Sequence, residues 1–118
     1  IGREVSIGSN CLIAGTLIAD NPGHRKEYED RLRRRVDPET IGRIRIEDHV
    51  WMAQFSVIIG DVTIGTGAII GAKAFVNKNV PPFCVAAGIP ARIIAKLPIP
   101  EEMMEAIGEE GLRRYNEA

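Results

Sequence analysis

The chain has 118 residues, enough for one domain, and 45% of them are apolar, enough for a buried core. Its formal net charge is −1, which excludes a general electrostatic attraction to nucleic acid, and no apolar run is long enough to span a membrane. We recognise no signal peptide, and Cys11 and Cys84 lie far apart in the sequence. We therefore expect two reduced thiols and a cytoplasmic protein.

Residues 1–18 form the first predicted element, a set of three six-residue repeats. An isoleucine opens each repeat and an apolar residue takes its fifth place, which gives Ile1, Ile7 and Ile13 and then Val5, Cys11 and Leu17. No helix has a six-residue period. The pattern is typical of a solenoid in which every repeat is a short flat strand followed by a turn.

The stretch from about residue 19 to about residue 43 is polar and loses this period. We predict a long loop inserted into the solenoid, with a helical turn near residues 27–34. Loops of this length are usually functional or disordered. The basic run at residues 31–35 has two interpretations: it binds a phosphorylated or nucleotide-linked sugar, or it is a solvated surface paired with nearby acidic side chains.

The six-residue pattern resumes at Ile44 or Ile46 and continues to Val80. Aliphatic residues open the repeats at Ile46, Met52, Ile58, Ile64, Ile70 and Val76. Small or β-branched residues follow four positions later, at Val50, Ser56, Val62, Ala68, Ala74 and Val80. A short strand cannot bury its apolar side alone, so successive coils have to stack for a core to exist. The pattern therefore predicts a narrow solenoid built from hexapeptides.

Prolines 81 and 82 end the strand pattern, because proline cannot donate to a strand ladder. Residues 83–94 are expected to form a last irregular coil with a turn at residues 88–90. Pro100, followed by two glutamates, suits the start of a helix over residues 100–116. We predict two parts: a solenoid at residues 1–97, and a helical extension at residues 98–118 that covers the open end of the solenoid or a neighbouring subunit.

Four segments, in addition to the six-residue pattern itself, carry a family resemblance: DHVWMA at 48–53, GDVTIG at 60–65, VPP at 80–82 and AGIPARII at 87–94. With the repeats, they resemble the hexapeptide-repeat acyltransferases. The most similar group contains the maltose, galactoside and polysaccharide-biosynthesis O-acetyltransferases. The resemblance implies an all-β fold, a left-handed parallel β-helix with three flat faces. It also implies a homotrimer with active sites between subunits, acetyl-CoA as donor, a sugar or nucleotide-sugar acceptor, and no metal.

Acetyl transfer from a thioester to a hydroxyl needs a base for the hydroxyl proton, and histidine is suited to this at neutral pH. The chain offers two histidines, His24 and His49. The resemblance implies that His24, in the inserted loop, is the catalytic base. His49 is expected to be a turn residue, and it is the alternative candidate. Asp20 and Glu47 are both candidates for the group that orients the base, and Asp20 is also a candidate contact to the acceptor.

The resemblance also implies which residues bind the coenzyme. Small residues let a ligand approach the backbone, and the corresponding positions for the pantetheine arm are Ala53, Gly71 and Ala72. The polar and basic positions near the phosphates are Asn77, Lys78 and Arg92. Lys73 is either a further phosphate contact or a solvated lysine. Trp51 is expected to point away from the interior, either beside the acceptor site or as a structural anchor between subunits.

Other functions stay open at this point. A non-enzymatic solenoid could act as a scaffold or assembly subunit. A γ-class carbonic anhydrase could use the same scaffold, but that chemistry needs three histidines around a metal, and the chain has two. A cysteine nucleophile at Cys84 is a minor further alternative, since no adjacent base is visible.

Overall fold

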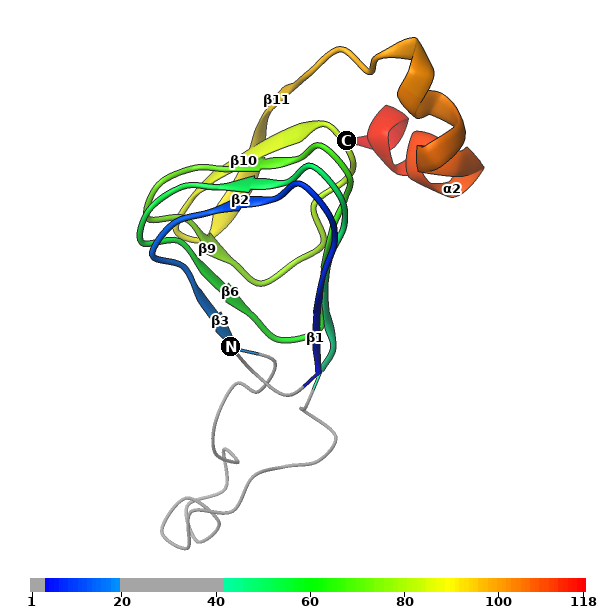
Figure 1. Ribbon diagram of the computed structural model, residues 1–118. Helices are drawn as coiled ribbons and strands as arrows, with labels where there is room; N and C mark the ends of the chain where they lie inside the picture. Colours follow the sequence, from blue (N-terminus) through cyan, green and yellow to red (C-terminus); the bar gives the residue numbers. More distant parts are fainter. Residues whose placement is uncertain (1–3, 20–41) are drawn as a thin grey trace, which may run out of the picture.

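The computed structural model describes residues 4–19 and 42–118, and this part of the chain winds into a three-sided parallel β-helix (Figure 1). Each complete coil has three short strands. The first coil contains β1 (Val5–Ile7), β2 (Leu12–Ile13) and β3 (Leu17–Ala19). The second contains β4 (Ile44–Ile46), β5 (Trp51–Met52) and β6 (Val57–Ile59). The third contains β7 (Val62–Ile64), β8 (Ile69–Ile70) and β9 (Phe75–Val76).

Strands stack in parallel register from coil to coil and form three sheets. Sheet A has the order β1-β4-β7, and sheet C has the order β3-β6-β9. Sheet B contains β2, β5 and β8 and is extended by β10 (Cys84–Gly88) and then β11 (Ala91–Lys96). The predicted left-handed parallel β-helix is confirmed. Below, the A–B and B–C corners are the turns that join these sheets within a coil, and the C–A corner is the turn that leads from one coil to the next.

The insertion lies at the C–A corner, between β3 and β4. Equivalent positions on the second and third coils are 18 residues apart, as with Arg43 and Asp61. Across the first coil the spacing is 39 residues, as with Ser9 and Asp48, against 18 for a regular coil. The insertion itself adds 22 residues, because 24 residues separate β3 from β4 and two separate β6 from β7. Most of the predicted loop, including its helical turn and the basic run at residues 31–35, lies outside the described residues.

Burial confirms the six-residue pattern over residues 46–80. Every residue that opens a repeat there is at most 1% exposed, and every residue four positions later is at most 4% exposed. Two inward-facing positions per strand therefore fill the interior of the three-sided β-helix. Ser56 is the polar member of this set, and its Oγ donates to the carbonyl oxygen of Ala53 (3.0 Å). This bond offsets the cost of burying a hydroxyl group.

The expectation that Leu17 occupies an inward fifth place is wrong. Leu17 is 57% exposed, whereas Ile18 is 2% exposed and pairs with Ile58. Thr16 takes the place opposite Ser56, and their hydroxyl oxygens are 3.0 Å apart. The B–C corner of the first coil is one residue shorter than that of the second, so the inward positions shift by one residue.

One residue at each A–B corner and at each B–C corner that joins parallel strands adopts a left-handed backbone conformation, which is unfavourable for residues with a side chain. At the A–B corner these residues are Asn10, His49, Gly67 and Phe83, and at the B–C corner they are Gly15, Phe55 and Lys73. The N–H groups of these residues in later coils bond back to the preceding coil, as from His49 to the carbonyl oxygen of Ser9 (2.9 Å). The prediction that His49 is a turn residue is therefore confirmed.

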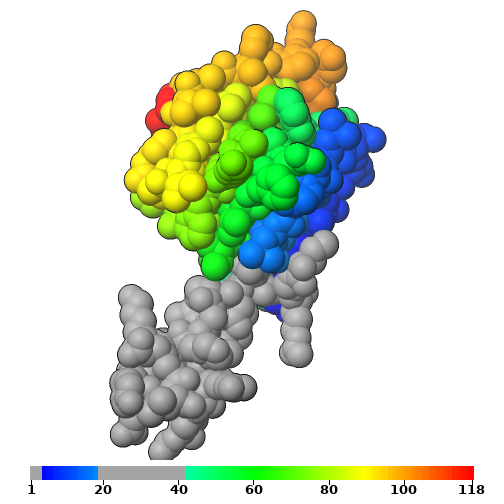
Figure 2. Space-filling model, turned by 90° about the vertical axis from the view of Figure 1, so that its left-hand side faces the viewer, coloured from blue at the N-terminus to red at the C-terminus, as the bar shows by residue number. Residues whose placement is uncertain are grey.

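The three outer faces differ in chemistry. On sheet A the aligned outward residues are polar: Ser6, Arg45 and Thr63. On sheet B they are apolar: Leu12, Trp51, Ile69 and Val85. On sheet C they are also apolar: Leu17, Val57 and Phe75. Figure 2 looks onto the side that carries sheet C, where the coils follow one another from blue through green to yellow.

The parallel stacking ends at β11, which runs antiparallel to β10 after the predicted turn at residues 88–90. The predicted terminal helix is confirmed as a short 3-10 helix η2 (Glu101–Met103) followed by α2 (Met104–Glu117), which bends at Gly108. It lies beside the A–B corner rather than over the open end of the solenoid (Figure 1). The hydroxyl of Tyr115 anchors it through a bond to the carbonyl oxygen of Leu97 (2.8 Å). Within the described ranges, no helix has the length and apolarity to cross a bilayer.

Candidate active site

The predicted pantetheine contacts come together at the B–C corner. Ala53 directly follows β5, and Gly71 takes the equivalent place after β8 on the next coil. Their N–H groups bond to the carbonyl oxygens of Ile70 (2.9 Å) and Ala86 (2.8 Å), which holds the coils in register. A Cβ on Gly71 would lie 3.0 Å from the Cβ of Ala87, closer than most such contacts. The corner thus presents a column of small residues, with Ala72 exposed beside it.

The predicted phosphate contacts come together at the end of the β-helix. Asn77, Lys78 and Arg92 line one cavity of about 150 Å³ between the turn after β9 and β11. Inward residues of the last coil complete its wall: Val76, Val80, Ala86 and Ile93. Neither Lys78 nor Arg92 forms an ion pair with another described residue, so both cations are available to an anionic ligand.

The B–C corner and the end cavity lie at opposite ends of one short strand. Gly71 and Ala72 precede β9, and Asn77 and Lys78 follow it directly. Phe75, within β9, faces outward between them and is only partly buried. The two groups of predicted coenzyme contacts are therefore joined across the outer face of sheet C.

Trp51 lies on β5, on the outer face of sheet B, and its side chain is 49% exposed. It pairs with Leu12 on one side and with Ile69 on the other. The prediction that Trp51 points away from the interior is confirmed. Because β5 leads directly into Ala53, the indole lies on the face next to the candidate coenzyme corner.

Two of the predicted acid–base residues lie at the other edge of sheet B. His49 is exposed at the A–B corner, and Glu47 is at the same corner. The Oε1 atom of Glu47 accepts a hydrogen bond from the N–H of Thr66 (3.1 Å), which gives this carboxylate a structural role. Asp20 and His24 lie outside the described residues, so their roles stay predictions.

Cys84 is fully buried and has no exposed side-chain surface. Burial raises the pKa of its thiol, with a smaller opposing effect from Lys96. A raised pKa lowers the fraction of thiolate, which is the reactive form. The geometry therefore gives no support to a cysteine nucleophile. Among the described residues, no group of three histidine, cysteine, aspartate or glutamate side chains is arranged to hold a metal ion.

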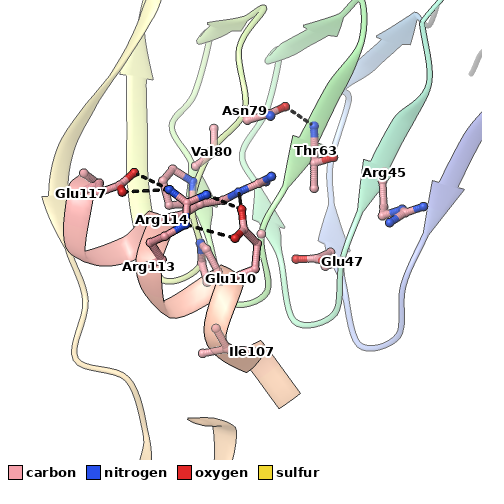
Figure 3. Close-up of a pocket in the computed structure, with 15 residues that line it drawn as sticks. Arg45, Glu47, Thr63, Asn79, Val80, Ile107, Glu110, Arg113, Arg114 and Glu117 are labelled. Carbon is pink, nitrogen blue, oxygen red and sulfur yellow. Dashed lines mark hydrogen bonds and ion pairs between the residues drawn. The ribbon is translucent and has the colours of Figure 1, made fainter. Parts of the chain in front are cut away.

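A larger cavity of about 660 Å³ lies between α2 and the outer face of sheet A (Figure 3). Arg45, Thr63 and Asn79 line its sheet side, and charged residues of α2 line the opposite side. The helix charges are paired within α2: Arg113 bonds to Glu117 (2.8 Å) and to Glu110, and Arg114 also bonds to Glu110 (3.1 Å). Hydrogen bonds from Arg113 and then Arg114 lower the pKa of Glu110. None of the predicted coenzyme contacts lines this cavity.

Two residues at the B–C corner escaped the sequence analysis. Gln54 and Phe55 both lie between Ala53 and Ser56, and both are exposed. Phe55 is 65% exposed although its side chain is large and apolar. The sequence did contain a signal for Phe55: it is an aromatic residue at a turn position of its repeat. The residues at the same turn position in the neighbouring coils are Gly15 and Lys73.

Comparison with known proteins identifies the family of this chain. Residues 43–78 match the family model described as "Bacterial transferase hexapeptide (six repeats)". Galactoside O-acetyltransferase of Escherichia coli is 39% identical over 95 residues, which cover 79% of this chain and 44% of that protein. A chloramphenicol acetyltransferase of Agrobacterium fabrum is 33% identical over 108 residues, which cover 81% of this chain and 50% of that protein.

A solved structure of a galactoside acetyltransferase in complex with coenzyme A superimposes with a TM-score of 0.73 at 37% sequence identity. The match covers 80% of this chain and 46% of that one. The chain spans about half the length of the curated relatives it matches. The repeats, the coil geometry and these relatives agree, and the chain belongs to the hexapeptide-repeat acyltransferase family.

Proposed function

We propose that this chain carries an acetyl-CoA-dependent O-acetyltransferase activity towards a hydroxyl group of a sugar or glycan precursor. The observation that carries the proposal is the pairing of a small-residue corner with an end cavity lined by two cations, neither of which forms an ion pair within the described part of the chain. The matched relative named a galactoside O-acetyltransferase and the coenzyme A complex support the choice of donor and acceptor class.

The residues present fit coenzyme A. Ala53, Gly71 and Ala72 have small side chains or none, so an extended, flexible arm can approach the backbone of the B–C corner closely. Lys78 and Arg92 supply positive charge for phosphate groups, and Asn77 adds a neutral polar group beside them. A bound acetyl-CoA supplies an acetyl group activated as a thioester. The protein holds this group in register for attack, which removes much of the entropic part of the barrier.

His24 acts as the general base in this proposal. Its imidazole accepts the proton of the acceptor hydroxyl as that oxygen bonds to the acetyl carbonyl carbon. The carbon–sulfur bond then breaks, and the proton passes from His24 to the departing thiolate. Asp20 contacts the acceptor or orients His24. The hydrogen bond from Thr66 to Glu47 makes Glu47 the weaker choice for the orienting role.

We also propose that the chain forms a homotrimer with active sites between subunits. The outer faces of sheets B and C carry aligned apolar residues and meet at the B–C corner, whereas the outer face of sheet A is polar. Apolar faces on either side of one corner favour association through that corner. The catalytic unit is the solenoid at residues 1–97, and residues 98–118 are a helical extension. Both free thiols suit the reducing cytoplasm.

Replacement of Trp51 by glutamate is expected to convert the trimer into monomers. A charge at the centre of the sheet B face cannot be desolvated without a partner, so burial of this face becomes unfavourable. Light scattering coupled to size-exclusion chromatography measures the mass. The matched control, Arg45→Glu on the polar face of sheet A, is expected to stay trimeric. A Trp51→Glu protein that keeps the mass of the parent would contradict the proposed interface.

Replacement of Lys78 or Arg92 by alanine is expected to raise the KM for acetyl-CoA by about 10- to 100-fold each, because a charge-assisted hydrogen bond contributes about 1.5–3 kcal/mol. Thiol release with a panel of sugars and nucleotide sugars measures the rate. Arg43→Ala, at the position directly before β4 and outside the end cavity, is the control and should leave KM unchanged. Absence of coenzyme A binding by calorimetry at millimolar concentration would instead favour a non-enzymatic scaffold.

A further inference from the structure

Phe55 combines two features that are unfavourable for folding. Its φ angle is 63°, in the left-handed region that side chains disfavour, and its side chain is 65% exposed. The equivalent residue on the preceding coil is Gly15, which adopts this conformation freely, and the equivalent on the next coil is Lys73, a polar residue. The conformation recurs at the other corners and is set by the turn, but neither the turn nor the core needs an aromatic ring at this position.

The ring lies within the candidate coenzyme corner. Phe55 is two residues from Ala53 in the same turn, and the turn of the next coil contains Ala72 and Lys73. The N–H of Lys73 bonds to the carbonyl oxygen of Gln54 (3.0 Å), and the N–H of Phe55 bonds to that of Gly15 (3.1 Å). These bonds place Phe55 directly between the corner turns of the first and third coils.

The surface beside Phe55 is open towards the first coil. That corner is one residue shorter, and Gly15 has no side chain to cover the ring. A Cβ built on Gly15 would have only the backbone nitrogen of Phe55 nearby, at 3.9 Å. The shortened corner therefore forms a step next to an exposed aromatic ring, which is a suitable place for a flat apolar group.

The direction of the coenzyme follows from the proposed function, on which this inference rests. Lys78 and Arg92 fix the phosphates at the end cavity, beyond the third coil. The arm then passes the third-coil residues Gly71 and Ala72 towards the second coil. This path brings the thioester to the coil that carries Phe55, so the acceptor hydroxyl has to arrive beside its ring.

We propose that Phe55 is a specificity-determining residue that packs against the acceptor. Its ring contacts a flat apolar face of the acceptor, which is either the C–H face of a pyranose ring or an aryl substituent. Aromatic rings favour such faces through burial and offset stacking. The exposed ring is thereby explained by a contact that forms only when the acceptor is bound, whereas the backbone conformation belongs to the corner itself.

The test compares the wild-type chain with Phe55→Gly and Phe55→Ala, using galactose and an aryl β-galactoside as acceptors. The acceptor kcat/KM is expected to fall by about tenfold in both variants, while the KM for acetyl-CoA stays the same. A fall with galactose assigns the contact to the pyranose face, and a fall confined to the aryl β-galactoside assigns it to the aryl group. Phe55→Gly is also expected to unfold at a higher urea concentration, because glycine relieves the backbone conformation.

Asn10→Gly is the matched control, since Asn10 has the same backbone conformation (φ 60°) at the A–B corner. It should leave acceptor kinetics unchanged. An unchanged acceptor kcat/KM in both Phe55 variants overturns the assignment but leaves the acetyltransferase intact. Dissociation of the trimer by Phe55→Gly also overturns it, because the ring would then be a subunit contact. A wild-type chain that releases no thiol with any acceptor overturns the proposed function itself.

Discussion

The His24→Gln protein is expected to transfer acetyl groups about 10²–10⁴-fold more slowly than the parent, the usual contribution of a positioned general base. Glutamine keeps a polar side chain but cannot accept the hydroxyl proton at neutral pH. The loss should appear in kcat, measured as thiol release at saturating acceptor. Coenzyme A affinity, measured by calorimetry, should stay unchanged, because His24 is not among the proposed coenzyme contacts, which are Ala53, Gly71, Ala72, Asn77, Lys78 and Arg92.

His49→Gln provides the matched control for this experiment. His49 is exposed, holds a turn at the A–B corner and is the other histidine of the chain. Its replacement should leave kcat within about twofold, since surface substitutions usually have small effects. The opposite pattern, with a slow His49→Gln protein and a His24→Gln protein at the parent rate, would transfer the proposed role of base to His49.

Truncation of Ile64 to alanine is expected to lower the free energy of unfolding by about 2–5 kcal/mol. Ile64 is fully buried in β7 and lies between Ile46 of the preceding coil and Val80 of the following one. The cavity therefore weakens both neighbouring interfaces of a structure whose coils are stabilised by their neighbours. Total stabilities of about 5–15 kcal/mol make such a loss severe. Urea unfolding followed by circular dichroism measures it.

Ile94→Ala removes the same atoms from an exposed site. Ile94 lies on β11 and is 64% exposed, so its truncation should change the free energy of unfolding by no more than about 0.5 kcal/mol. Similar losses at Ile64 and Ile94 would mean that the six-residue pattern does not mark the core. That outcome would be incompatible with a core formed by the stacked coils of the β-helix.

The six-residue repeats predicted the core well because a narrow three-sided coil allows few positions at which a side chain can be buried. In a narrow three-sided coil, the inward positions recur at a fixed spacing, and a residue such as Met52 or Val62 has no other place to be buried. Leu17 was predicted wrongly because one deleted corner residue moves every later inward position of that coil. Leu17 and Ile18 are both aliphatic, so the pattern alone does not choose between them, and the choice depends on pairing with β6.

The candidate site was only partly predictable. Lys78 and Arg92 share a cavity because β11 folds back along β10, and no periodicity in residues 83–94 predicts that reversal. The family resemblance supplied both residues. Phe55 was missed because its significance depends on exposure and backbone conformation together. The position of α2 depends on a few contacts, such as that of Tyr115 with Leu97, which the amphipathic pattern does not specify.

A crystal structure of the chain soaked with coenzyme A tests the central claim most directly. We expect the pantetheine arm to lie along the B–C corner over Gly71 and Ala72, with the phosphates at Lys78 and Arg92. The thiol should point towards the coil that carries Phe55. Coenzyme density in the cavity between α2 and sheet A, or an unoccupied B–C corner at saturating ligand, would contradict the account.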